Sequence, residues 1–405
     1  MPRAFLTVLD SVGCGGATDA DHFGDVGANT LGNLFRAHAA GKLPDGSGAS
    51  LELPNLVRLG LGASLRLASG RCIDGEVPAS NAIWGVAEPV SPGKDTLTGH
   101  WELAGVPLPW SWHVFPRSVP AFPEWLLQSV SKACGSDGTL ANCHSSGTEV
   151  IEEFGAEHLR TARPICYTSA DSVFQIAAHE ERFGLGRLYR LCKEIAEVLH
   201  GMKVGRVIAR PFAGDAERGF FRTSNRRDYS YRAPEPTLLD RVVEAGGTTH
   251  AVGKINDIFA GRGISFAHDG RDDMERMDRL IELAGSAPDG SLVIANFVEF
   301  DTLFGHRRDP EGYAGALARF DCRIPEIFAG VRRGDLLAFT ADHGNDPTWR
   351  GTDHTRERVP ILAAMPGTGG RCVGIRRFAD IGETVAAHLG LAPGRHGEDF
   401  LSSRR

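Results

Sequence analysis

Short apolar runs recur along the chain and predict the buried strands of a parallel sheet. They are rich in Val, Leu and Ile and show almost no alternation with polar residues, which is typical of strands covered on both faces. Amphipathic stretches at 273–284 and 379–389 carry apolar residues every three or four positions and predict helices. This alternation predicts a doubly wound α/β core. The predicted strands are residues 4–9, 250–253, 291–300 and 335–340.

Chemically active side chains follow three of the predicted strands. Asp10 ends the first strand, Asp301 follows the third, and Asp342 with His343 follows the last. Because the carboxyl ends of parallel strands meet at one edge of a sheet, we predict a single crevice there. An isolated Asp at a strand end is more often a helix cap or a turn former, but caps at all three ends would be a coincidence.

The middle of the chain departs from this alternation. Prolines cluster between residues 107 and 123 and recur at 234 and 236, which indicates hinges around a segment of mixed strand and helix patterns. A chain of 405 residues also exceeds the usual size of one hydrophobic core. The Gly- and Ala-rich residues 37–50 predict a surface loop. We predict a metal-binding catalytic core of residues 1–107 and 235–405 with an inserted α+β cap domain, residues 108–234.

Composition narrows the class of protein. Hydrophobic residues make up 42% and charged residues 23%, and no apolar run approaches the roughly 20 residues that span a bilayer. The eight cysteines are too sparse for a disulfide framework, so we expect reduced thiols and a cytoplasmic location. The net charge of −7 and the scattered arginines argue against a nucleic-acid partner, and no obligate protein partner is evident.

Two sets of donor residues predict metal ions. Asp301 and His306 are close enough for a turn to fold both onto one ion, and His354 can supply a third ligand. Carboxylate oxygen with neutral imidazole suits Mn²⁺ or Zn²⁺ better than Ca²⁺, which prefers oxygen alone. The second predicted set combines residues from two strand ends, Asp10, Asp342 and His343, and leaves room for a hydroxyl.

Thr96 is the predicted source of that hydroxyl. A threonine is a poor nucleophile at neutral pH, and the chain has no Ser-His-Asp arrangement to deprotonate it, but direct coordination to a metal lowers its pKa. Lys94 can stabilise the charge of a phosphate nearby. Threonines near helix starts commonly act as caps, which is the alternative for Thr96 and for Thr98. The combination predicts phosphoryl transfer.

The motifs of other enzyme classes are incomplete. His179-Glu180-Glu181 lacks the second histidine of a zincin, and Gly93-Lys94 lacks the remaining residues of a P-loop. No dinucleotide fingerprint follows the first strand. We therefore set aside a protease, a P-loop NTPase and a Rossmann dehydrogenase.

Almost end to end, the sequence resembles the phosphopentomutase family of the alkaline phosphatase superfamily. The resemblance implies an alkaline-phosphatase-like core with a mostly parallel sheet flanked by helices. The matching segments are 10–13 (DSVG), 23–25 (FGD), 53–62 (LPNLVRLGLG), 93–102 (GKDTLTGHWE), 146–149 (SGTE), 167–173 (YTSADSV), 205–212 (GRVIARPF), 253–255 (GKI), 304–310 (FGHRRDP) and 341–347 (ADHGNDP).

The resemblance also implies roles for single residues. Thr96 would be the residue that is phosphorylated in the active enzyme. Two Mn²⁺ ions would be bound, one by Asp301, His306 and His354, and the other by Asp10, Asp342, His343 and the Thr96 oxygen. The substrate residues would be Ser169 and Asp171 on the sugar, with Arg210 and Lys254 on phosphate or ribose oxygens.

The reaction implied by the resemblance interconverts α-D-ribose 1-phosphate, or its 2-deoxy form, with the 5-phosphate. Phospho-Thr96 would give a 1,5-bisphosphate intermediate, and a sugar bisphosphate such as glucose 1,6-bisphosphate would charge Thr96 initially. The intermediate must be protected from water, which gives the cap domain a reason to exist.

Four rival functions can be compared with the sequence. A sulfatase would need a Cys/Ser-x-Pro-x-Arg segment, which is absent, and a cofactor-independent phosphoglycerate mutase would carry a serine nucleophile where this chain has Lys94-Asp95-Thr96. A noncatalytic binding protein would be expected to lose a ligand or Thr96, and none is lost. A phosphatase that uses the same ions remains open.

Overall fold

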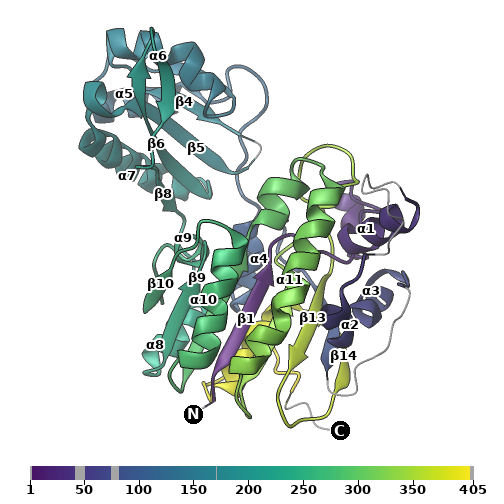
Figure 1. Ribbon diagram of the computed structural model, residues 1–405. Coiled ribbons are helices and arrows are strands. Elements are labelled where there is room, and N and C mark those ends of the chain that lie inside the picture. Colours follow the sequence, from purple (N-terminus) through teal and green to yellow (C-terminus); the bar gives the residue numbers. More distant parts are fainter. Residues whose placement is uncertain (1, 42–50, 74–81, 170, 402–405) are drawn as a thin grey trace. The chain divides into compact units, whose positions relative to one another are not determined.

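The structure is a computed structural model that describes residues 2–41, 51–73, 82–169 and 171–401. The chain forms two compact units (Figure 1). The first unit combines Met1–Trp110 with Ala233–Arg405, and the second is Ser111–Arg232. The boundaries predicted at residues 108 and 234 differ from these by only a few residues.

A large, mostly parallel sheet forms the centre of the first unit. Its eight described strands follow the order β10-β9-β11-β1-β12-β13-β2-β14. β13 runs antiparallel to both of its neighbours, and the other neighbouring pairs are parallel. The strands are β1 (Ala4–Leu9), β2 (Ile83–Glu88), β9 (Thr248–Val252), β10 (Phe266–His268), β11 (Ser291–Phe297), β12 (Leu336–Thr340), β13 (Val359–Ala364) and β14 (Arg371–Arg377).

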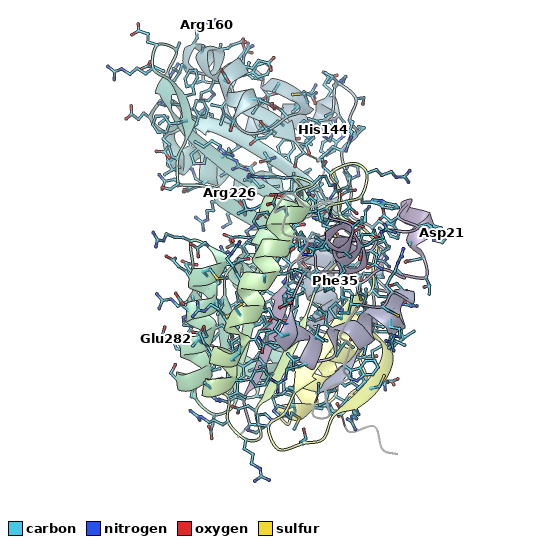
Figure 2. The ribbon with its side chains drawn as sticks, turned by 45° about the vertical axis from the view of Figure 1, so that its right-hand side comes forward. Asp21, Phe35, His144, Arg160, Arg226 and Glu282 are labelled. Atoms are coloured by element: carbon cyan, nitrogen blue, oxygen red, sulfur yellow. The ribbon has the colours of Figure 1, made fainter. Side chains whose placement is uncertain are left out.

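Helices flank this sheet, and α10 and α11 lie together across one face of it (Figure 1). Charged side chains such as Asp21 and Glu282 project from the outside of the unit (Figure 2). The helices are η1 (Ala20–Phe23), α1 (Thr30–Ala39), α2 (Pro54–Arg58), α3 (Leu61–Ser69), α4 (Thr96–Leu103), α8 (Leu238–Glu244), α9 (Ile255–Ile258), α10 (Asp273–Ser286), η3 (Phe300–Gly305), α11 (Pro310–Gly330) and α12 (Phe378–His388).

Two local predictions differ from the structure. The strand predicted at 291–300 ends at Phe297, because the Asp273 carboxylate accepts from the next two backbone N–H groups, those of Val298 and Glu299. Asp301 therefore lies in the π-helical turn η3 rather than at a strand end. The predicted loop 37–50 begins too early, since residues 37–39 complete helix α1, and residues 42–50 lie outside the described residues.

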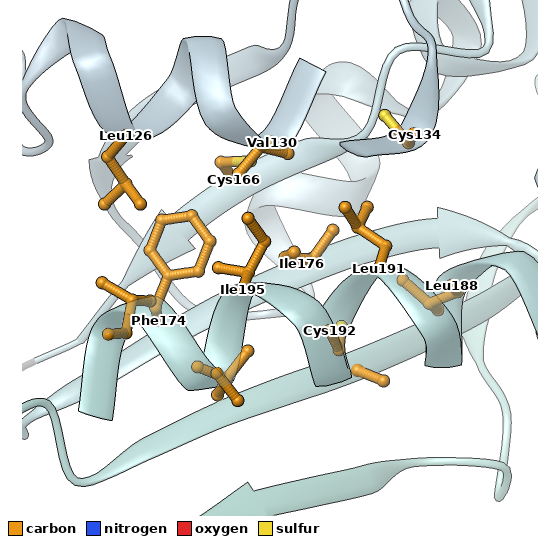
Figure 3. Packing of buried hydrophobic residues seen from close by; sticks show 14 of the residues in the cluster. Leu126, Val130, Cys134, Cys166, Phe174, Ile176, Leu188, Leu191, Cys192 and Ile195 are labelled. Atoms are coloured by element: carbon orange, nitrogen blue, oxygen red, sulfur yellow. The ribbon is translucent and has the colours of Figure 1, made fainter. Parts of the chain in front are cut away.

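The second unit has its own sheet and its own core. Described strands follow the order β3-β4-β5-β6-β7, and β8 pairs with β6. Leu126 and Val130 of α5 pack in one cluster with Leu191 and Ile195 of α7 and with Phe174 of β5 (Figure 3). The elements are α5 (Glu124–Cys134), β3 (Leu140–His144), α6 (Glu149–Thr161), β4 (Ile165–Thr168), β5 (Val173–His179), η2 (Glu180–Gly184), α7 (Leu185–Gly201), β6 (Arg206–Asp215), β7 (Gly219–Arg222) and β8 (Arg227–Ser230).

Two further features concern both units. Within the described ranges, none of the helices combines the length and the apolar character that a membrane crossing needs. All eight cysteines lie in the described part of the chain, and each is a free thiol.

Candidate metal centre

Three neighbouring strands bring the predicted donors to one edge of the large sheet. β1 lies between β11 and β12, and all three are parallel, so their carboxyl ends coincide. Asp10 follows β1 directly, and Asp342 with His343 follows β12. Ser11 adopts a left-handed backbone conformation (φ 70°), and its N–H donates to Asp342 Oδ1 over 3.1 Å. The turn after β1 thus ties two strand ends together.

The first donor group consists of Asp10, Asp342 and His343, which are all buried. One ligand atom from each of them lies within 4.8 Å of the others. His343 Nε2 is 3.5 Å from Asp10 Oδ1 and 3.4 Å from Asp342 Oδ2. His343 Nδ1 faces the Gly344 carbonyl at 3.1 Å, so Nδ1 carries the proton and the Nε2 lone pair faces the carboxylates.

Each carboxylate of this group has one oxygen that is held and one that is available. Asn296 donates to Asp10 Oδ2 over 3.0 Å, and Asp342 Oδ1 accepts from the backbone as described above. Asp10 Oδ1 and Asp342 Oδ2 are buried and have no hydrogen-bond partner. His100 Nδ1 lies 3.0 Å from Asp342 Oδ2, but its proton is directed to the Thr96 carbonyl at 2.9 Å. Two buried anionic oxygens that face one imidazole nitrogen fit a cation.

The second donor group consists of Asp301, His306 and His354. Asp301 Oδ2 is 3.1 Å from His306 Nε2, and Asp301 Oδ1 is 3.4 Å from His354 Nε2. The two imidazole Nε2 atoms are only 3.1 Å apart. His306 Nδ1 faces the Thr352 carbonyl at 2.7 Å and therefore carries the proton, which leaves Nε2 free to bind a metal.

The two groups lie side by side and share a concentration of negative charge. The rings of His343 and His354 stack with centroids 4.0 Å apart. Burial raises the pKa of Asp10 well above its usual range, and the charges of Asp342 and Asp301 raise it further. Burial also lowers the pKa of His343, which favours the neutral imidazole that binds metals. Divalent cations would offset the carboxylate charge, so the residues present fit two adjacent ions.

Thr96 and Thr98 have different environments. Thr96 is the first residue of α4, and its Oγ1 lies 3.3 Å from His343 Nε2, beside the first donor group. Asp95 caps the helix by accepting from the Thr98 N–H, and the Thr98 hydroxyl donates to Asp95 Oδ2 over 2.6 Å. The capping role considered for both threonines thus belongs to the Asp95–Thr98 pair.

Two buried charged residues hold the loop that precedes Thr96, and sequence reasoning gave them no role. The Glu102 carboxylate accepts from the N–H groups of Val90 and Ser91, each over 2.9 Å. Arg356 donates to the carbonyls of Ser91 and Gly93 over 2.8 and 2.6 Å. Both the N–H groups and the carbonyl groups of this loop are therefore held by side chains of the first unit.

The predicted basic residues of the first unit also lie near the donors. Lys94 forms ion pairs with Asp25 at 2.9 Å and with Asp353 at 3.5 Å, so part of its charge is already compensated. Lys254 follows strand β9, and its charge lowers the pKa of Asp10 against the larger effect of burial. Both lysines therefore belong to the same edge of the large sheet as the donor groups.

Ser169, Asp171 and Arg210 lie in the second unit and are not part of the two donor groups. Asp171 is 3.6 Å from Arg206, and Arg210 donates to Gln175 Oε1 over 2.9 Å. Burial lowers the pKa of Arg210, which lies beside the hydroxyl of Tyr167. The charges of Arg222 and Arg226 lower the pKa of Arg210 as well, so positive charge is concentrated here. Figure 2 labels Arg226.

Sequence reasoning missed the neutral and basic residues that surround the donors. Asn296, Asn345 and Arg308 contact either a donor carboxylate or the loops that carry the donors. An asparagine within a buried strand such as β11 is a signal that could have pointed to Asn296, because a buried amide requires partners. Arg308 and Asn345 lie in the matching segments 304–310 and 341–347, but neither was assigned a role of its own.

A mostly parallel α/β sheet that carries two adjacent groups of carboxylates and imidazoles at one edge is the arrangement of a metalloenzyme, and each group has the donors to hold a cation. In agreement, a family model described as Metalloenzyme superfamily matches residues 2–393. Phosphopentomutase of Chelativorans sp. (strain BNC1) is 53% identical and covers 100% of this chain and 99% of its own length. That of Rhizobium meliloti (strain 1021) is 51% identical over 99% of this chain and 100% of its own length. The chain belongs to the phosphopentomutase family.

The chain is accordingly an isomerase, a mutase that acts on pentose phosphates, and its core is alkaline-phosphatase-like. The predicted family, fold class and enzyme class are thereby confirmed. Among solved structures, phosphoglycerate mutase of Leishmania mexicana is 12% identical and covers 98% of this chain and 97% of its own chain, with a TM-score of 0.46.

Proposed function

We propose that the chain interconverts α-D-ribose 1-phosphate, or 2-deoxyribose 1-phosphate, and the corresponding 5-phosphate through a phosphorylated Thr96. The observation that carries this proposal is the position of Thr96 Oγ1, 3.3 Å from His343 Nε2 in the first donor group. Thr98 is engaged with Asp95 and is the weaker candidate for the nucleophile. Membership in the phosphopentomutase family supports the substrate class.

In the proposed reaction, phospho-Thr96 gives its phosphoryl group to the free hydroxyl of the sugar monophosphate. The bond between phosphorus and Thr96 Oγ1 breaks, a bond to the sugar oxygen forms, and the proton of the sugar hydroxyl passes to Thr96 Oγ1. The product is a 1,5-bisphosphate. Its other phosphoryl group then returns to Thr96 Oγ1 as the bond from phosphorus to the second sugar oxygen breaks, and the threonine proton passes to that oxygen. The helix start and the clamped loop keep Thr96 in place through both transfers.

We assign two Mn²⁺ ions to the donor groups. Divalent cations there would lower the pKa of the Thr96 hydroxyl and offset charge on the transferred phosphoryl group. The mixture of carboxylate oxygen and imidazole nitrogen supports Mn²⁺ over Ca²⁺. One ion would be held by Asp301, His306 and His354, and the other by Asp10, Asp342, His343 and Thr96 Oγ1.

The substrate residues are proposed to be three basic side chains, one hydroxyl and one carboxylate. The concentration of arginines around Arg210 supports an anion partner for the second unit. A sugar bisphosphate such as glucose 1,6-bisphosphate would charge Thr96 before the first turnover. The eight free thiols support a cytoplasmic location. The proposed substrate residues are Lys94, Ser169, Asp171, Arg210 and Lys254.

The test follows ribose 5-phosphate with Mn²⁺, with and without glucose 1,6-bisphosphate, and measures ribose 1-phosphate against free phosphate. We expect ribose 1-phosphate to dominate and to need the bisphosphate for full rate. Predominant free phosphate would instead identify a phosphatase. Thr96→Ala should abolish isomerisation, whereas the matched variant Thr98→Ala should lose helix stability but keep turnover. If Thr96→Ala keeps turnover and Thr98→Ala abolishes it, Thr98 is the nucleophile instead.

A further inference from the structure

Arg308 donates from one guanidinium to three separate segments of the first unit. It reaches the Gly305 carbonyl over 2.7 Å, the Gly351 carbonyl over 2.5 Å and the Asp353 carbonyl over 2.8 Å. It also donates to Asn345 Oδ1 through a short hydrogen bond. Gly305 belongs to the turn η3, and the other acceptors lie at two points of the single connection between β12 and β13, at residue 345 and at residues 351–353. A planar fork of donors is the side chain that can serve such a set.

Each segment that Arg308 reaches also carries or holds a donor of the second group. Gly305 precedes His306, and Gly351 and Asp353 lie just before His354. Asn345 donates from Nδ2 to Asp301 Oδ1 over 2.7 Å. Because Asn345 Oδ1 accepts from Arg308, the orientation of the amide is fixed, and its Nδ2 is turned toward the carboxylate. One guanidinium therefore holds the segments or the side chain that position all three donor residues, and it contacts none of their ligand atoms.

The backbone conformation of Arg308 is one that an arginine rarely adopts. Arg308 has φ 54°, in the left-handed region that favours glycine or asparagine. A conformation of this kind persists when the surrounding contacts outweigh its cost, which is on the order of 1 kcal/mol. The four hydrogen bonds of the guanidinium are contacts of the required kind.

We propose that Arg308 is a positioning residue of the second donor group, which sets the spacing of Asp301, His306 and His354 and thereby the affinity of the ion that they bind. The inference rests on the proposed two-ion centre and extends it to a residue that touches neither ion nor substrate. Losing an outer partner of metal ligands typically lowers metal affinity by about 10- to 100-fold. Arg308 should act on one ion site and leave the other unchanged.

The test is a Mn²⁺ titration of the chelator-treated full-length chain, with free Mn²⁺ measured by electron paramagnetic resonance. Arg308→Lys keeps the positive charge but replaces the fork by a single ammonium. The matched control is Arg307→Lys at the exposed neighbouring position. Asp301→Asn, which replaces the anionic ligand of the second group by a neutral amide, serves as the reference. Far-ultraviolet circular dichroism of each metal-free variant checks the fold.

We expect the wild type and Arg307→Lys to bind two ions. Arg308→Lys should bind one ion with unchanged affinity and the other about 10- to 100-fold more weakly, as Asp301→Asn does for the same site. Two ions of wild-type affinity in Arg308→Lys would overturn the role of Arg308 alone. An equal loss at both sites would also overturn it, because the effect would then be general.

The wild-type titration separates the two proposals. A wild type that binds no ion would refute both the two-ion centre and the role of Arg308. If the wild type binds a single ion, the two-ion centre is refuted, and the role of Arg308 stands only if Arg308→Lys and Asp301→Asn both weaken that ion. Should Arg308→Lys fail to fold, Arg308→Gly, which relieves the left-handed backbone, must show the same selective loss.

Discussion

Gly99 of helix α4 packs closely against Asp342 of the first donor group. A Cβ atom added there would be 2.0 Å from the Asp342 carbonyl oxygen and 2.8 Å from Asp342 Cβ. Real Cβ atoms essentially never come within 3.0 Å of such a neighbour, so Gly99→Ala forces α4 and Asp342 apart by about 1 Å. The obstacle is mostly backbone, which cannot rotate away as a long side chain can.

The displacement acts on two parts of the proposed centre at once. Thr96 begins the same helix, and Asp342 contributes a donor oxygen. A misplacement of about 1 Å in a catalytic arrangement lowers the rate by roughly 100-fold. The effect on folding is smaller, because overpacking of about 1–3 kcal/mol is partly offset by the roughly 1 kcal/mol by which alanine exceeds glycine in helix propensity.

The assay compares kcat for the isomerisation with the free energy of unfolding in urea. For Gly99→Ala we expect a fall of about 100-fold in kcat and a loss of at most about 2 kcal/mol in stability. Gly285→Ala in α10 is the matched control, since a Cβ there meets nothing within 4 Å. It should keep full activity and gain up to about 1 kcal/mol. A Gly99→Ala enzyme within threefold of the wild-type rate would refute the reasoning.

Three further predictions concern pH, loop position and metal removal. Burial lowers the pKa of His158 to about 4, so the native ring stays neutral where the unfolded chain takes up a proton. The free energy of unfolding, measured in urea, should therefore fall by about 2 kcal/mol between pH 7.5 and 5. His158→Gln should remove this pH dependence. Arg356→Lys should lower kcat on the order of tenfold without changing the number of bound ions, because it loses carbonyl partners in the loop before Thr96. Chelation should lower the melting temperature, and Mn²⁺ at 100 times its dissociation constant should restore about 2.7 kcal/mol for each ion bound. An unchanged melting curve would contradict the two-ion centre.

The signs of the pH effect follow from the hydrogen bonds of His158. Its Nδ1 donates to the Arg163 carbonyl over 2.6 Å, and its Nε2 accepts from the His179 N–H over 3.0 Å. A proton on Nε2 would oppose that N–H, so the folded state stays neutral while the unfolded chain binds a proton below its ordinary pKa of 6.5. The stabilisation is present above pH 6.5 and is lost as the pH falls toward 4. A flat profile would contradict it.

The strands and the donor types could be predicted from sequence because they depend on local patterns. Residues 4–9 were predicted with the bounds that β1 has, and apolar runs of this kind identify buried parallel strands. The exact end of β11 could not be predicted, since it depends on a carboxylate from α10 that takes the backbone N–H groups after Phe297. The π-helical turn that carries Asp301 follows from that tertiary contact.

The surroundings of the donors could not be predicted because they depend on contacts between distant segments. Asn345 contacts Asp301 across 44 positions, and Asn296 contacts Asp10 across 286. A single sequence contains no periodicity that relates such positions. The Asp95–Thr98 cap is local and could have been recognised as an N-cap ahead of a helix, which would have separated Thr98 from Thr96 on sequence alone.

The two asparagines share a property that explains their use beside the donor carboxylates. An amide Nδ2 group donates a hydrogen bond without a charge, so it orients a carboxylate and favours its ionised form. Lysine or arginine at these positions would orient the carboxylate equally well but would neutralise charge that a divalent cation needs. Each amide is in turn fixed by a second partner, Arg308 for Asn345 and His100 for Asn296. Asn345 thus separates the positive charge of Arg308 from Asp301. The contact with Asn345 orients the Asp301 carboxylate, while the negative charge of the carboxylate stays available to the ion.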